Sequence, residues 1–199
     1  EAVSVLVDGE APLAMTRTHP VGIYEATLPE PASHGGSFDY RLRVTYPGGY
    51  NADVDDPYRF GRVITDYDLY LFGEGNHTRI HDKLGAHLMT IGSTEGVHFA
   101  VWAPNATRVS VIGDFNGWDG RVHPMRRLGV SGVWEIFVPT AALGNRYKFE
   151  LRTAAGEILF GARGDLEAAD GDIELCPAPL GCRDGAIDQR DVVGLALPP

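Results

Sequence analysis

Residues 109–114 read VSVIGD, and the same pattern stands at residues 3–8 as VSVLVD. Two further blocks recur in the same order: GIYEATLP at 22–29 returns as GVWEIFVP at 132–139, and FDYRLR at 38–43 returns as YKFELR at 147–152. The copies are separated by 106, 110 and 109 residues, so both order and spacing are kept. Such a repeat predicts two copies of one domain.

Apolar and polar residues alternate within each block, which is typical of a half-buried strand. Tyr24 in the first copy aligns with Trp134 in the second, and Leu42 aligns with Leu151 in the same way. The opposite face of each strand is polar and changes its charge between the copies. A shared apolar face with a variable polar face predicts an antiparallel β-sandwich for each copy, and therefore an all-β chain.

The second copy has an additional alternating stretch, GVHFAVW at 96–102, for which the first copy has no counterpart. We therefore expect the first sandwich, residues 1–66, to be truncated at its N-terminus by roughly 20–25 residues. Residues 67–95 are predicted to form a linker, and residues 96–160 the second sandwich.

Residues 161–199 lose both the periodicity and the aromatic residues of the preceding chain. This composition predicts an irregular, disordered tail. Two explanations remain open for the abrupt change after Phe160: a shifted reading frame, or a genuine alternative C-terminus.

The charge balance excludes several classes of partner. The chain has 199 residues, with 17 Lys and Arg against 27 Asp and Glu, a net charge of −10. Nucleic acids and anionic membrane surfaces require clustered basic residues, so neither is expected as a partner. No apolar run approaches the roughly 20 residues that span a bilayer, and no secretory signal is recognisable, so we expect a cytoplasmic protein. Cys176 and Cys182 lack nearby histidines at metal-ligand spacing, and we expect neither a metal nor a cofactor.

Three stretches in the middle of the chain resemble bacterial 1,4-α-glucan (glycogen) branching enzymes. They are DPYRFG at 56–61, DLYLFGEGNH at 68–77, and FAVWAPNA at 99–106 leading into GDFNGW at 113–118. The resemblance covers about residues 1–160. It implies two tandem immunoglobulin-like β-sandwiches, of which the second is a family-48 carbohydrate-binding module used in glycogen biosynthesis.

In the family that these stretches resemble, an α-amylase-type barrel performs the glucan transfer with two carboxylates. A barrel of this kind takes about 250 residues, more than the whole chain. After Phe160 the sequence reads GARG where the family pattern would continue in the manner of Asp56-Pro57-Tyr58. No catalytic residue can therefore be assigned, and we expect the chain to be inactive alone.

Trp118 closes the GDFNGW turn, and an indole there offers an apolar surface on which a sugar ring stacks. Related modules use this Trp as a sugar platform and the Lys of a Tyr-Lys-Phe block as a sugar contact, which here is Lys148. Asn116 is the third predicted carbohydrate-binding residue, through hydrogen bonds to hydroxyls. The alternatives are a Trp118 that plugs the end of the sandwich, an Asn116 that holds its own turn, and a solvated Lys148.

The other two Trp residues are predicted to be structural, because Trp134 and Trp102 fall in alternating strands. A second stacking Trp of the related modules would follow a Gly near Gly156, where this chain has Glu157.

Two functions remain open. The first is an accessory region that binds α-glucan, either glycogen or maltooligosaccharide. The second is a structural or interaction module that binds no glucan and packs on a catalytic barrel or mediates oligomerisation. We also expect self-association through exposed faces. A self-contained enzyme is excluded by the length and by the absence of a constellation of carboxylates.

Overall fold

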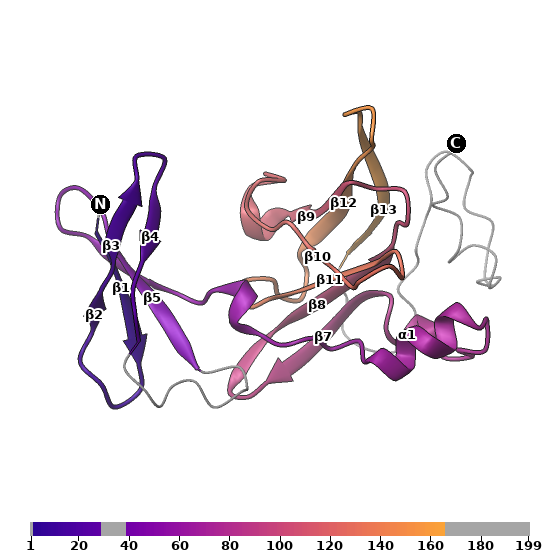
Figure 1. The fold of residues 1–199 in the computed structure, drawn as a ribbon, viewed down its shortest axis with the longest axis horizontal. Helices are drawn as coiled ribbons and strands as arrows, with labels where there is room; N and C mark the ends of the chain where they lie inside the picture. Colours follow the sequence, from indigo (N-terminus) through magenta and orange to yellow (C-terminus); the bar gives the residue numbers. More distant parts are fainter. Residues whose placement is uncertain (1, 29–38, 166–199) are drawn as a thin grey trace. The chain divides into compact units, whose positions relative to one another are not determined.

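The computed structural model describes residues 2–28 and 39–165 (Figure 1). The chain divides into two compact units, Glu1–Gly61 and Arg62–Pro199. In these described residues the elements are strands with one short α-helix and three 3₁₀ turns, so the all-β prediction is confirmed.

The first unit contains a four-stranded antiparallel sheet in the order β2-β1-β5-β6 and a separate pair, β3 and β4. The strands are β1 Ala2–Val7, β2 Leu13–Ala14, β3 Thr16–His19, β4 Ile23–Glu25, β5 Tyr40–Thr45 and β6 Asn51–Val54, followed by the 3₁₀ turn η1 at Pro57–Arg59.

The predicted inward face of residues 22–29 is only partly formed. Strand β4 is three residues long, Tyr24 is half-buried, and Ala26 is exposed beyond the end of the strand. Ile23 is 54% exposed. Among the described strands β4 pairs with β3 alone, whereas its counterpart β11 has a strand on both sides, so β4 has fewer neighbours that can bury its side chains.

The second unit is a sandwich of two antiparallel sheets, ordered β10-β11-β8-β7 and β13-β12-β9. The strands are β7 Gly85–Ile91, β8 Thr94–Trp102, β9 Arg108–Gly113, β10 Arg126–Arg127, β11 Val133–Val138, β12 Arg146–Arg152 and β13 Ile158–Asp165, with the 3₁₀ turn η3 at Asp114–Asn116. One apolar core lies between the sheets, where Phe99 of β8 packs against Tyr147 and Phe149 of β12. The predicted alternation is kept in the first half of β12, where Tyr147 and Phe149 are buried and Lys148 between them is half-buried, whereas all six residues of β11 are buried.

The outer face of the first sheet is buried as well. Helix α1, Asp66–Gly73, and the 3₁₀ turn η2, Ile80–Asp82, contribute to a second apolar cluster with Ala100 and Val133. The segment predicted as a linker, residues 67–95, therefore holds α1, η2 and β7. Strand β13 likewise continues to Asp165, five residues into the predicted tail; the rest of that tail lies outside the described residues.

The repeat extends further than the sequence indicated. The Met15 N–H donates to Val3 O at 2.8 Å, and the Met125 N–H donates to Val109 O at 2.8 Å. Arg17 pairs with Tyr24 as Arg127 pairs with Trp134. Residues 13–17 and 123–127 are thus a further matching block.

The alignment of the third block requires a correction. Val7 pairs with Tyr40, and its counterpart Gly113 pairs with Tyr147, so the structural offset is 107 residues and not 109. The hairpin turns that follow agree, because Gly49 and Gly156 both have φ 85°. A shift of two residues keeps every side chain on its original face of the sheet, which is why the sequence pattern did not detect it.

A buried carboxylate, Glu135, fixes the start of the second unit to its sheet. The N–H groups of Val63 and Ile64 donate to Glu135 Oε2 at 3.3 and 3.0 Å, and His98 Nε2 donates to the same oxygen at 3.1 Å. Burial raises the pKa of the Glu135 carboxyl, but the hydrogen bonds from His98 and Ile64 outweigh it, and the resulting pKa lies below the ordinary value.

We expect Glu135→Ala to lower the free energy of unfolding by about 2–4 kcal/mol at neutral pH, because His98 and two backbone N–H groups would be left without their acceptor. The pKa of Glu135 is lower in the folded state than in the unfolded state. The contribution of the Glu135 carboxylate to the free energy of unfolding is therefore complete above the unfolded pKa of about 4.3, and it disappears as the pH falls through the folded pKa. Urea denaturation at neutral and acidic pH measures the difference.

Glu95→Ala, at an exposed position near the start of β8, is the matched control and should change the free energy of unfolding by at most about 0.5 kcal/mol. Equal effects of the two substitutions, or a Glu135 effect that persists unchanged in acid, would contradict this account.

Candidate functional site

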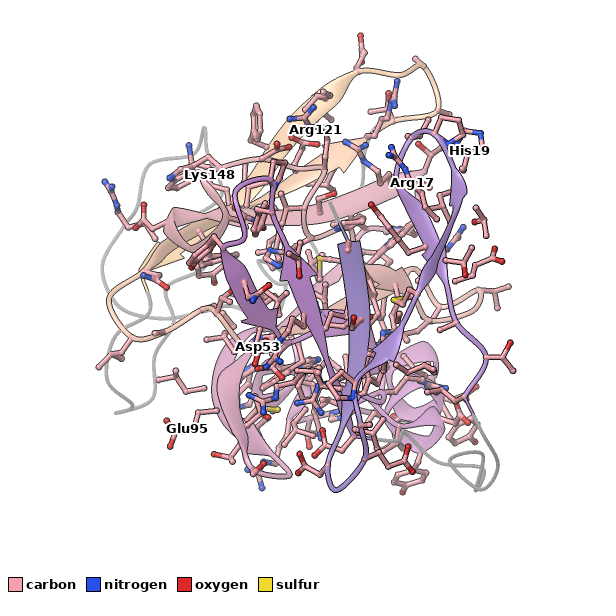
Figure 2. The ribbon with its side chains drawn as sticks, turned by 90° about the vertical axis from the view of Figure 1, so that its left-hand side faces the viewer. Arg17, His19, Asp53, Glu95, Arg121 and Lys148 are labelled. Carbon is pink, nitrogen blue, oxygen red and sulfur yellow. The ribbon has the colours of Figure 1, made fainter. Side chains whose placement is uncertain are left out.

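The candidate site is built on a loop that the second unit has and the first lacks. Between matched strands, the first unit has five residues, 8–12, and the second has nine, 114–122. The longer loop begins with η3 and carries the predicted residues Asn116 and Trp118. Lys148 of β12 and Arg121 of the loop are labelled in Figure 2.

Trp118 has an unusual backbone conformation. Among the described residues it is the one non-glycine residue with a positive φ, 63°. A bulky side chain in this left-handed region is strained by about 1–2 kcal/mol. The side chain is nevertheless 39% exposed, so burial of the indole does not account for the strain. Strained residues of this kind are concentrated at functional sites.

Asp114 binds both the indole of Trp118 and the backbone of Arg146. Its Oδ1 accepts the indole N–H at 3.1 Å, and its Oδ2 accepts the backbone N–H of Arg146 at 2.8 Å. The Arg146 N–H is the main reason that the pKa of Asp114 lies below its ordinary value, so the carboxylate remains charged at neutral pH. The indole is therefore fixed to β12 through one acidic side chain.

Lys148 lies over the Trp118 ring. Its Nζ is 5.9 Å from the ring centroid. As predicted, Lys148 points away from the core side of β12, where Tyr147 and Phe149 are buried. An ammonium group in this position makes a cation–π contact with the indole and keeps hydrogen-bond donors beside its face.

Asn116 is occupied inside the loop. Its Oδ1 accepts the Gly113 N–H at 2.9 Å, and its Nδ2 donates to Val111 O at 2.9 Å and lies 2.9 Å from His123 Nδ1. Both N–H bonds of the amide thus have partners in the protein. The structure brings Trp118 and Lys148 together and places Asn116 behind them.

Two further contacts hold the loop against β12. A Cβ added to Gly113 would lie 2.4 Å from Arg146 O, and one added to Gly120 would lie 2.3 Å from Glu150 Oε1. Glu150 in turn accepts a hydrogen bond from Arg108 at 2.6 Å. The backbone oxygen of Arg146 therefore requires glycine at position 113, whereas at position 120 the flexible Glu150 carboxylate could move aside.

The other two indoles are structural. Trp134 is 6% exposed and donates to Ala103 O at 3.0 Å. Trp102 is half-buried, donates to Ser131 O at 3.2 Å, and packs edge-to-face on Phe72. Both predictions are confirmed. Glu157, at the position of the expected second platform, is exposed at the β12–β13 turn.

Sequence reasoning missed Asp114, Arg146 and His123. Asp114 recurs as Asp8, so the sequence marks it only as part of the repeat, and the contacts of the other two depend on how β12 and the loop meet. Within residues 2–28 and 39–165, no three His, Cys, Asp or Glu side chains gather in a way that would hold a metal ion. No helix in the same residues has the length and hydrophobicity to cross a membrane.

Comparison with known families agrees with this architecture. Residues 83–163 match carbohydrate-binding module 48 (isoamylase N-terminal domain). Residues 1–58 match the N-terminal domain of the alpha-1,4-glucan branching enzyme GlgB. The chain is thus similar to the N-terminal region of GlgB branching enzymes. Its second unit is accordingly a carbohydrate-binding accessory region.

The GlgB relatives are similar over most of this chain. The 1,4-alpha-glucan branching enzyme GlgB of Rhodopseudomonas palustris is 53% identical over 146 residues, which are 73% of this chain and 19% of the relative. That of Rubrobacter xylanophilus is 51% identical over 158 residues, 79% of this chain and 21% of the relative. The chain therefore spans about a fifth of the length of these GlgB proteins.

Among solved structures, a pullulanase of Paenibacillus barengoltzii complexed with maltotetraose is 26% identical and covers 40% of this chain and 12% of its own. The TM-score is 0.33, which is too low to support an inference.

We expect Trp118→Gly to change the free energy of unfolding by less than about 1 kcal/mol, because glycine relieves the positive φ and the lost indole was partly exposed. Trp134→Ala is the control and should cost at least about 3 kcal/mol, since it empties a buried site. Chemical denaturation measures both. A loss with Trp118→Gly as large as that of the control would mean that Trp118 plugs the sandwich.

Proposed function

We propose that the second unit binds α-glucan, as glycogen or maltooligosaccharide, with Trp118 as the stacking platform and Lys148 as a hydrogen-bond donor beside it. The observation that carries this proposal is the conformation of Trp118, which is strained, exposed and bound by Asp114, with the Lys148 ammonium 5.9 Å from the ring centroid. A side chain held at this cost serves a purpose other than packing.

The chemistry of the surface suits a neutral sugar polymer. The C–H face of a glucose ring packs on an indole, and the ammonium of Lys148 donates to ring hydroxyls. The net charge of −10 repels polyanions but has no such effect on an uncharged glucan. For Asn116 we propose positioning in place of direct contact, because both N–H bonds of its amide are used inside the loop.

We further propose that this module serves a 1,4-α-glucan branching enzyme of glycogen biosynthesis. In such an enzyme a bound glucan chain raises the local concentration of substrate at a catalytic domain. The similarity of the chain to the N-terminal region of GlgB branching enzymes supports this role.

We expect Trp118→Ala to weaken glycogen binding at least about tenfold, because a central aromatic anchor typically contributes 1–2 kcal/mol or more. Lys148→Met should weaken it less, since the ring remains. Affinity electrophoresis through gels with embedded glycogen measures the retardation of each variant.

Tyr67→Ala is the matched control, because the Tyr67 ring is 68% exposed on α1, away from the loop. It should migrate as the wild type does. Wild-type mobility that is the same with and without glycogen would refute the binding function.

One observation favours the second function, an interaction module. Three consecutive apolar residues on β13, Ile158, Leu159 and Phe160, are 51%, 38% and 58% exposed. Strand β13 lies at the edge of its sheet. An exposed apolar edge strand is a place where another chain can pair. We propose that this edge packs on a catalytic domain or on a second copy of the chain.

We expect the wild type to self-associate with increasing concentration, and Phe160→Glu to shift the equilibrium toward monomer, because a charge on an edge strand opposes pairing. Sedimentation velocity over a range of concentrations measures this. Tyr70→Glu on α1 is the control for added charge, and a monomeric wild type at every concentration would exclude self-association.

A further inference from the structure

His123 lies directly behind the Trp118 loop and takes part in its hydrogen bonds. The side chain is buried, with 6% exposed. Its ring centroid is 5.8 Å from that of Phe115, which in turn packs on Phe99 of the core at 5.5 Å. Its Nδ1 is 2.9 Å from Asn116 Nδ2.

The network fixes which groups donate. The Gly113 N–H points at one atom of the Asn116 amide, which must therefore be the oxygen, and Val111 O faces the other atom, which must be the nitrogen. Asn116 Nδ2 thus donates to His123, so Nδ1 of His123 is an acceptor without a proton. A neutral imidazole with its proton on Nε2 satisfies the Gly113 N–H, Val111 O and both N–H bonds of the Asn116 amide.

Protonation of the ring destroys this arrangement. Imidazolium carries a proton on both nitrogens, and Nδ1–H would face the N–H of Asn116. Rotating the amide by half a turn does not help, because its oxygen would then face Val111 O and its nitrogen would face the Gly113 N–H. No orientation of Asn116 satisfies a protonated His123, Gly113 and Val111 together.

The charged groups around the loop are already paired with one another. Within the loop, Asp119 binds Arg121. On the neighbouring strands, Arg146 binds Asp114 and Glu150 binds Arg108, while Lys148 lies over the Trp118 ring. Burial of the ring lowers the pKa of His123 below its ordinary value. The imidazole is therefore neutral at neutral pH, and its protonation requires a more acidic solution than that of an unburied imidazole.

We propose that neutral His123 is a positioning residue for the Trp118 loop and acts through Asn116, so that protonation of the imidazole releases the loop and weakens α-glucan binding. The expected loss of α-glucan binding rests on the proposed function. The expected release of the loop rests on the hydrogen bonds alone.

The experiment compares glycogen affinity and loop structure at about pH 7.5 and about pH 5. Affinity electrophoresis gives the first. Nitrogen-15 NMR gives the second, through the Trp118 indole N–H and the Gly113 amide, which donate to Asp114 and Asn116. In the wild type we expect both resonances to shift with a single midpoint below about 6.5, and affinity to fall at least about tenfold.

Two variants separate a positioning role from a merely structural one. His123→Asn places an amide oxygen near the position of Nδ1 and takes up no proton, so it should bind as the wild type does at neutral pH and lose the pH dependence. His123→Leu removes the acceptor and should bind weakly at both pH values. His81→Asn is the control, because the His81 side chain is 64% exposed, and it should retain the pH dependence of the wild type.

A wild-type affinity that is equal at both pH values, or a His123→Asn variant that keeps the full pH dependence, would overturn the proposal. If the wild type binds no glycogen at either pH, the proposed function fails, and the role of His123 in the loop is then decided by the two NMR resonances. Resonances that do not move with pH would reject it.

Discussion

The register of β12 against β9 is the constraint on which both the core and the candidate site depend. Pairing Tyr147 with Gly113 turns Tyr147 and Phe149 toward the core and leaves Lys148 on the outer face. The same register brings the Arg146 N–H to Asp114 at the first residue of the long loop. A slip of one residue would exchange the two faces of β12 and move Lys148 away from Trp118.

The two copies of the repeat show how one scaffold acquires a site. Both keep the hydrogen bond from a Met N–H to the first Val of the block, at Met15 and Met125, and both have a glycine at positive φ in the following hairpin. The difference lies in the loop at 114–122, which is four residues longer than its counterpart at 8–12. The strands supply a rigid base, and the added residues supply the exposed aromatic ring.

The conformation of the loop costs stability at Trp118 but keeps the Trp118 ring exposed. Trp118 is held at positive φ, and Asn116, Asp114 and His123 are all used to maintain that conformation. Each of these polar groups has partners inside the protein, so the loop is rigid before a ligand arrives. A rigid platform binds at a lower entropic cost than one that must be ordered by the ligand.

The sequence by itself determined the repeat, the all-β class and the resemblance to branching enzymes, because period-two patterns and short motifs are local properties of the chain. It also singled out Trp118 and Lys148. The sequence did not predict that α1 and η2 cover the outer face of the sheet. A strand buried on both faces and a short helix with weak periodicity have no clear alternation of apolar and polar residues. Tertiary structure alone decided the 107-residue offset, the occupation of the Asn116 amide, and the place of His123 behind it. All three features depend on how separate strands and a loop meet in space. A register shift of two residues, or a hydrogen bond between distant residues, does not change the order of hydrophobic and polar residues in the sequence.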